Sequence, residues 1–196
     1  MLFRSLVRET DLAEVSAAVR QKEHEINELR AEASQLRTYQ GLLDSLGFFP
    51  HSLSLLTEGT RTVRGIAGTV KAEQFEAFRR ALVEFAQDTE LILPKDIPAA
   101  RDVSVVVLLS RDRSDKIIET CTRNGMSISD IPPSLKATVT EESVALVSKL
   151  ADLGLKEQAL SEDLDALAER WMPIVQKLSD YWNSLAGQLP DRKSVV

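Results

Sequence analysis

The sequence predicts an α+β protein in which two long helices flank a small lobe of strands and shorter helices. Apolar residues recur at alternating steps of three and four over residues 12–43 and again over 146–185, the heptad pattern of coiled-coil helices. Between them the pattern changes to short β-branched runs that alternate with amphipathic stretches. Each heptad seam is a narrow stripe that needs a partner, and the nearest partner is the other helix of the same chain.

The first long helix is expected over residues 10–47, preceded by a disordered segment over residues 1–9. Thr10 and Asp11 offer an N-cap, whereas Gly47 ends the heptad pattern, which only Lys22 and Gln40 interrupt. At 1.5 Å per residue such a helix is roughly 55 Å long, far above the length of an ordinary globular helix.

The return helix is expected over residues 136–186, followed by a flexible tail over 187–196. Thr138 and Glu141 have the spacing of a capping box, in which each side chain satisfies the backbone amide of the other residue. Pro173 removes one helical hydrogen bond, so we expect a kink close to Trp171.

The segment between the long helices, residues 48–135, reads as an α/β head. Its predicted strands are 62–70, 89–93, 103–109 and 126–131, with helices over 72–87 and from Asp112 or Ser114 to a stop at Asn124-Gly125. Gly65 and Gly68 indicate a bulge or a close backbone approach, and Val103–Leu109 is apolar enough for a strand buried on both faces. The order βαββαβ is that of a ferredoxin-like sandwich. The predicted architecture is therefore a long antiparallel two-helix coiled coil with a ferredoxin-like head inserted at its tip.

Folding the hairpin about the head pairs residue i with a residue near 186 − i. The N-terminal end of the first helix then lies opposite about Lys177, so Tyr181, Trp182 and Leu185 of the return helix project beyond it. An uncovered apolar end predicts a binding partner, a missing segment or weak self-association of the chain.

Composition narrows the classes of function. The chain has 196 residues and a formal charge of −6, from 24 basic and 30 acidic groups, which disfavours general binding of nucleic acid. Its single cysteine, Cys121, forms no internal disulfide and favours a reducing, cytosolic compartment. Residues 1–8 are too short and too charged for a secretory signal. The longest apolar run is far shorter than the ~20 residues that cross a bilayer, so no direct membrane span is expected.

No catalytic, cofactor-binding or metal-binding residues emerge. His24 and His51 lack ligands at metal-binding spacing, and Cys121 lies on an apolar helix face where a buried, inert thiol is expected. The glycine pair at 65 and 68 matches neither phosphate-binding loop. The densest basic feature comprises Arg79, Arg80, Arg111 and Arg113. These residues are either solvated charges of the head or a docking patch for an acidic helical partner.

The order of elements and several residues resemble the cytoplasmic N-terminal domain of subunit I, the subunit a homologue of archaeal and bacterial A/V-type rotary ATPases. The residues that carry the resemblance are Gly68-Thr69-Val70, the helix from Phe75 to Leu82, the strand from Val105 to Leu109, and Gly125-Met126-Ser127-Ile128-Ser129-Asp130-Ile131-Pro132. The resemblance covers roughly residues 10–185. The family's first strand–helix–strand unit and its membrane domain have no counterpart in these residues. The resemblance therefore extends only to the distal lobe and the connecting helices.

The resemblance implies a non-catalytic stator element at the cytoplasmic face of the membrane. In such machines this region docks the peripheral-stalk heterodimer, is joined to the remainder of the membrane-sector subunit, and resists torque during ATP-coupled proton or ion transport. It implies no cofactor. The main alternative is a coiled-coil homodimer with a ferredoxin-like, ligand-binding regulatory head, in which the seams pair between chains. A soluble enzyme is a third and weaker reading, for want of a nucleophile, base or cofactor loop.

Overall fold

The computed structural model describes residues 9–85, 87–96 and 102–188. The chain divides into two compact units, which are described separately. The helical unit contains the described residues up to Ser34 and from Leu150 onward, whereas the head unit spans Gln35–Lys149. The predicted disordered segment 1–9 and the predicted tail 187–196 fall almost wholly outside the described residues. The domain bounds proposed from the sequence stay a prediction.

A long helix occurs near each end of the sequence, and the strands and shorter helices come between them in chain order. The elements are α1 Glu9–Ser45, α2 Ser54–Thr57, β1 Val63–Val70, α3 Ala72–Leu82, η1 Val83–Phe85, β2 Thr89–Ile92, β3 Val103–Ser110, η2 Arg111–Arg113, α4 Ser114–Arg123, β4 Met126–Ile128 and α5 Val139–Gln188. Both η elements are 3-10 turns. The α+β class predicted from the sequence is confirmed.

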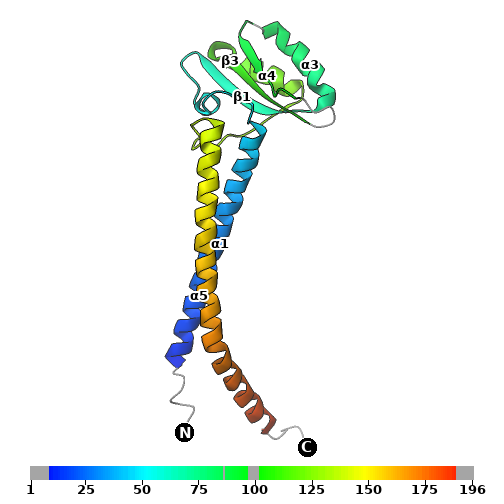
Figure 1. Ribbon diagram of the computed structural model, residues 1–196. Helices are drawn as coiled ribbons and strands as arrows, with labels where there is room; N and C mark the ends of the chain where they lie inside the picture. The colour runs from blue at the N-terminus through cyan, green and yellow to red at the C-terminus, as the bar shows by residue number, and fades with distance from the viewer. Residues whose placement is uncertain (1–8, 86, 97–101, 189–196) are drawn as a thin grey trace, which may run out of the picture. The chain divides into compact units, whose positions relative to one another are not determined.

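The sheet of the head unit has the ferredoxin-like topology that the order of elements predicts. Its strands lie in the order β2-β3-β1-β4, and all three pairings are antiparallel. The central pair runs from Val63 opposite Ser110 to Val70 opposite Val103 with no residue skipped. Helices α3 and α4 lie along one face of this sheet (Figure 1).

The core of the head forms between the sheet and these two helices. Helix α3 buries Phe75, Phe78 and Leu82 because they recur at steps of three and four. Strand β3 supplies every second residue from Val103 to Leu109, and α4 supplies Ile117 and Cys121. The alternation of β3 therefore directs one complete set of side chains toward the helices.

The other face of the sheet is covered in part by α2. Leu56 of α2 is buried and lies against Gly65, where an added Cβ would come 2.4 Å from the Leu56 Cδ2 atom. Val106 is fully buried on this face, but Ser104 and Leu108 are half-buried. The expectation that this strand is buried on both faces is thus only partly correct.

Gly65 and Gly68 serve a close approach, and the expected alternative of a bulge in β1 is wrong. The continuous register leaves no extra residue in the strand. At Gly68 an added Cβ would lie 2.3 Å from the backbone oxygen of Ser127 in β4, so only glycine allows this spacing.

Several element ends differ from the sequence prediction. The helix expected over 72–87 ends as an α-helix at Leu82 and continues as η1, and the last strand stops at Ile128 instead of residue 131. Neither Asp112 nor Ser114 caps α4 through its side chain. The preceding 3-10 turn η2 takes the place of a side-chain cap, because the Ser114 amide donates to the Arg111 carbonyl. The predicted stop at Gly125 is confirmed by its φ of 91°.

The segment that follows α1 and the segment that precedes α5 meet at a junction inside the head unit. The Leu53 amide donates to the Ala137 carbonyl at 2.9 Å, and the Ser54 amide donates to the Lys136 carbonyl at 3.2 Å. Apolar side chains bury the same region: Leu43, Leu46, Phe49, Leu53, Leu135, Val139 and Leu146. The segments that leave α1 and enter α5 are therefore held together by backbone bonds and by a shared core.

The predicted capping box begins α5. The Thr138 amide donates to the Glu141 carboxylate at 3.0 Å, while the Glu141 amide donates to the Thr138 hydroxyl at 3.4 Å. The neighbouring Glu142 carboxylate accepts from the amides of Lys136 and Ala137, both at 2.9 Å. Four backbone amides at the entrance to α5 are thus satisfied by side chains.

In the helical unit, α1 and α5 pair in the antiparallel register that the hairpin predicts. Lys22 forms an ion pair with Asp163 at 2.5 Å, where the rule 186 − i gives residue 164. Arg30 forms an ion pair with Glu157 at 2.6 Å, where the rule gives residue 156. Helix α5 continues through Pro173 and curves in its C-terminal part, as the orange and red segment of Figure 1 shows. None of the described helices is both long and apolar enough to cross a membrane.

Gly68→Ala should destabilise the head by about 1–3 kcal/mol, because the new methyl group would overlap the Ser127 backbone and push β4 away from β1. The matched control is Gly154→Ala in α5, where nothing lies within 4 Å of the new Cβ. This control should stabilise the helix by up to about 1 kcal/mol. Urea unfolding of both variants measures the two effects, and equal stability of the Gly68 variant and the wild type would refute the close approach.

Glu141→Gln should reduce stability at neutral pH and reduce it less in acid. Hydrogen bonds from the Thr138 backbone amide and then from its side chain lower the pKa of the Glu141 carboxyl below its usual range. The stabilisation by this carboxylate is therefore present above the ordinary carboxylate pKa and is lost as the pH falls through the lowered value. Urea unfolding at neutral and acidic pH measures the difference, which should narrow in acid. A constant difference would contradict this assignment.

Candidate docking surfaces

The two histidines and the single cysteine are the side chains that most often carry chemistry, and the structure gives each of them a different environment. His24 is exposed, with its Nε2 atom 3.4 Å from the Glu28 carboxylate, and the exposed His51 packs edge-on against Phe49. Burial raises the pKa of the Cys121 thiol to about 11, which suppresses the nucleophilic thiolate at neutral pH. Within the described residues, no three His, Cys, Asp or Glu side chains are grouped so that they could hold a metal ion.

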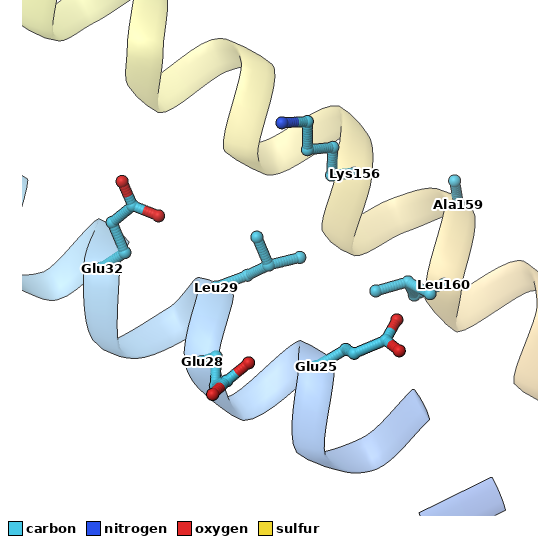
Figure 2. Close-up of a pocket in the computed structure, with 7 residues that line it drawn as sticks. All are labelled: Glu25, Glu28, Leu29, Glu32, Lys156, Ala159 and Leu160. Carbon is cyan, nitrogen blue, oxygen red and sulfur yellow. The ribbon is translucent and has the colours of Figure 1, made fainter. Parts of the chain in front are cut away.

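An open groove lies between α1 and α5 of the helical unit (Figure 2). Its α1 side presents Glu25, Glu28 and Glu32, and its α5 side presents Lys156. Leu29 and Leu160, both half-buried, extend from opposite helices toward the space between them. These leucines occupy the heptad seam, so the groove is the margin of the helix pair with a charged rim.

The C-terminal part of α5 exposes an apolar stripe. Its exposed members are Val175, Tyr181, Trp182 and Leu185, of which Trp182 is 65% exposed. Trp171, Ile174 and Leu178 are half-buried on the same side of the helix. At 100° per residue all seven fall within one arc of about 120°, which is the width of a helix-packing face. The sequence expectation that Tyr181, Trp182 and Leu185 lack a covering helix agrees with their exposure, and their role in binding stays a prediction.

The four predicted basic residues do not form one patch on one element. Arg79 and Arg80 are exposed on the last turn of α3. Arg111 and Arg113 lie in η2 and already have partners within the head. The Arg113 guanidinium forms an ion pair with Asp88 at 2.7 Å, and the Arg111 guanidinium donates to the Glu58 carbonyl. The Arg80 Nε atom donates to the Glu76 carbonyl at 3.2 Å within α3. Both Arg79 and Arg80 are exposed, so they remain accessible to an acidic partner.

Arg64 is a basic residue that the sequence reasoning missed. It lines a hollow with Thr57, Glu58, Arg111 and Ser114, which we name the arginine hollow. Its position opposite Leu109 in the β1–β3 register places it near η2. The available signal was a charged residue inside an otherwise apolar strand. Its position near Arg111 depends on the strand register, which the sequence leaves open.

No family model matches the sequence, and no curated protein matches it. Among solved structures, a match is found to the crystal structure of the cytoplasmic N-terminal domain of subunit I, homolog of subunit a, of V-ATPase. The TM-score is 0.52 and the sequence identity is 18%. The match covers 81% of this chain and 54% of that chain, so it spans about half of the length of that protein. The two chains share a fold.

The exposed stripe of α5 predicts concentration-dependent association. Trp182→Ser combined with Leu185→Ser should shift the protein toward the monomer, because the substitutions remove apolar surface that association would bury. Sedimentation velocity over a range of protein concentrations measures this shift. The control is Val83→Ser, which removes another exposed apolar side chain, from η1 of the head. A strictly monomeric wild type at high concentration would refute the prediction.

Proposed function

We propose that this chain is a non-catalytic stator element of a rotary A/V-type ATPase or ATP synthase. In this proposal it forms a cytoplasmic part of the membrane-sector subunit, docks the peripheral stalk and resists torque during ATP-coupled ion transport. The observation that carries the proposal is the shared fold with the cytoplasmic domain of V-ATPase subunit I, over 81% of this chain.

The helical unit supports a mechanical role. Its helices pair in one register through the seam, and ion pairs join Lys22 to Asp163 and Arg30 to Glu157 across it. A paired helix bends less readily than a single helix, because bending must also displace the side chains packed in the seam. Such a pair suits an element that holds a position under load.

The exposed stripe of α5 supports a contact with the remainder of the membrane-sector subunit. The known structure in the comparison is almost twice as long as the matched region, since only 54% of it is covered. Tyr181, Trp182 and Leu185 are the side chains that we assign to this contact, because aromatic and leucine side chains contribute large apolar areas to interfaces.

The head supports a docking role. Arg79 and Arg80 are exposed at the end of α3, a helix that Phe75, Phe78 and Leu82 fix to the sheet. Two charges on a rigid helix end can steer an acidic partner into one orientation. The alternative is a homodimer whose seams pair between chains. We favour the hairpin because the ion pairs Lys22–Asp163 and Arg30–Glu157 lie within one residue of the register expected when one chain folds back about its head.

Titration of the full chain against the purified peripheral-stalk heterodimer of the same organism's rotary ATPase tests the proposal. Calorimetry should detect a complex, and Arg79→Glu combined with Arg80→Glu should weaken it by about tenfold, or about 1.4 kcal/mol. Reversal of both charges replaces attraction by repulsion, and the effect should shrink as salt screens it.

The matched control is Lys71→Glu combined with Lys95→Glu, which makes the same change in net charge at exposed positions outside the last turn of α3. This control should leave the affinity nearly unchanged. A wild-type chain that ignores the stalk and forms a tight dimer would overturn the stator proposal in favour of the regulatory homodimer. Stalk binding that is insensitive to both pairs of reversals would remove Arg79 and Arg80 from the interface.

A further inference from the structure

The arginine hollow brings two guanidinium-bearing residues together from separate elements. It has a volume of about 400 Å³ and is lined by Thr57, Glu58, Arg64, Arg111 and Ser114. Arg64 comes from β1, Arg111 from η2, and Ser114 from the start of α4. Every lining residue carries a polar or charged side chain, unlike the seam and the core of the head.

Arg111 is held in place by the turn that precedes β1. Its backbone amide donates to the Thr62 carbonyl at 2.9 Å, and its guanidinium donates to the Glu58 carbonyl. Gly59, with a φ of 70°, makes this possible. An added Cβ there would lie 3.3 Å from the Arg111 guanidinium and 3.2 Å from the Arg64 Cα atom. The turn thus brings Arg111 beside Arg64 and fixes one end of its guanidinium before any ligand binds.

The charges around the hollow leave it positive. The Glu58 carboxylate also lines it but forms an ion pair with Lys136 at 2.5 Å, which offsets its charge. Among the described residues, the Arg64 guanidinium has no hydrogen bond or ion pair, and it is exposed. The half-buried hydroxyl groups of Thr57 and Ser114 are already engaged, since Thr57 donates to the Leu53 carbonyl at 3.4 Å and Ser114 donates to the Asp115 carboxylate at 3.4 Å. The donors that face a ligand are therefore the guanidinium groups of Arg64 and Arg111. This arrangement of donors fits a carboxylate or another oxyanion.

We propose that the arginine hollow binds a carboxylate of an acidic helical segment in a partner protein. This inference rests on the proposed docking role of the head and names the chemistry that the head recognises. The hollow is open to solvent, so a small free anion would keep most of its water and gain little from the arginines. A helical segment laid across the opening would exclude that water and strengthen the same ion pairs. Glutamates one turn apart on such a segment can reach Arg64 and Arg111 separately.

The test uses the full chain and three probes: an alanine-based helical peptide with glutamate pairs at i and i+4, the same peptide with glutamine in their place, and inorganic phosphate. Side-chain Nε–Hε signals of the arginines in NMR spectra report binding at each residue. We expect the glutamate peptide to shift the signals of Arg64 and Arg111 and the glutamine peptide to leave them unchanged. Arg64→Ala should weaken binding of the glutamate peptide by about tenfold.

The matched control is Arg61→Ala, which removes an exposed arginine three residues away and outside the hollow. It should retain the affinity of the wild type. Arg64→Lys keeps the charge but loses the planar pair of donors, so it should restore only part of the affinity. A thermal unfolding curve like that of the wild type excludes loss of the fold as the cause.

Three results would overturn the inference: a glutamate peptide that leaves both arginine signals unmoved, an Arg64→Ala variant that binds it as tightly as the wild type, or phosphate that binds more tightly than the peptide and excludes it. The last result would make the hollow a small-anion site. The peripheral-stalk heterodimer is titrated in parallel. If the stalk binds and Arg64→Ala has no effect, the stator proposal stands and the arginine hollow is not the docking site. If the peptide binds and the stalk does not, the hollow binds carboxylates and the stator proposal fails.

Discussion

The rest of the structure depends on the junction at which the chain leaves α1 and enters α5. Two segments more than eighty residues apart in sequence are joined there by backbone hydrogen bonds, from Leu53 to Ala137 and from Ser54 to Lys136. Leu53, Leu135 and Val139 are buried beside these bonds, so a backbone group left unsatisfied there would destabilise the fold. The capping box of Thr138 and Glu141 then fixes where α5 begins.

The chain contains two kinds of apolar core, one in the head and one in the seam of the helical unit. The sheet buries one face under α3 and α4, with Phe78 and Val105 fully enclosed. Part of its other face is covered by α2, which lies directly after the first junction segment. The seam of the helical unit needs only a stripe of small and medium side chains, such as Ile26, Ala33 and Leu153. The seam of the helical unit and the sandwich of the head can therefore both form in a chain that has few aromatic residues.

The features that could be predicted from the sequence are those governed by local spacing. The heptad seams, the capping box at Thr138 and the glycine stop at Gly125 each depend on residues within one or two helical turns. The pairing rule for the hairpin was correct to within one residue because α-helices have a constant rise. Local reasoning failed where a distant segment decides the outcome. The Arg111 amide is engaged by Thr62, and a 3-10 turn replaces the side-chain cap expected at α4. Arg64 was missed for the same reason, since only the strand register brings it beside Arg111.

The burial of Cys121 has a practical consequence for studying how the chain works. The sequence contains one cysteine, and this thiol is fully enclosed in the core of the head with a pKa raised to about 11. Thiol reagents act on exposed thiolates, so the native chain offers them almost no target at neutral pH. A single cysteine introduced at an exposed helix position such as Ser184 can therefore be labelled with a dye or a spin probe in an otherwise unchanged sequence. Two such positions, one in each compact unit, would allow the distance between the two units to be measured with a pair of probes.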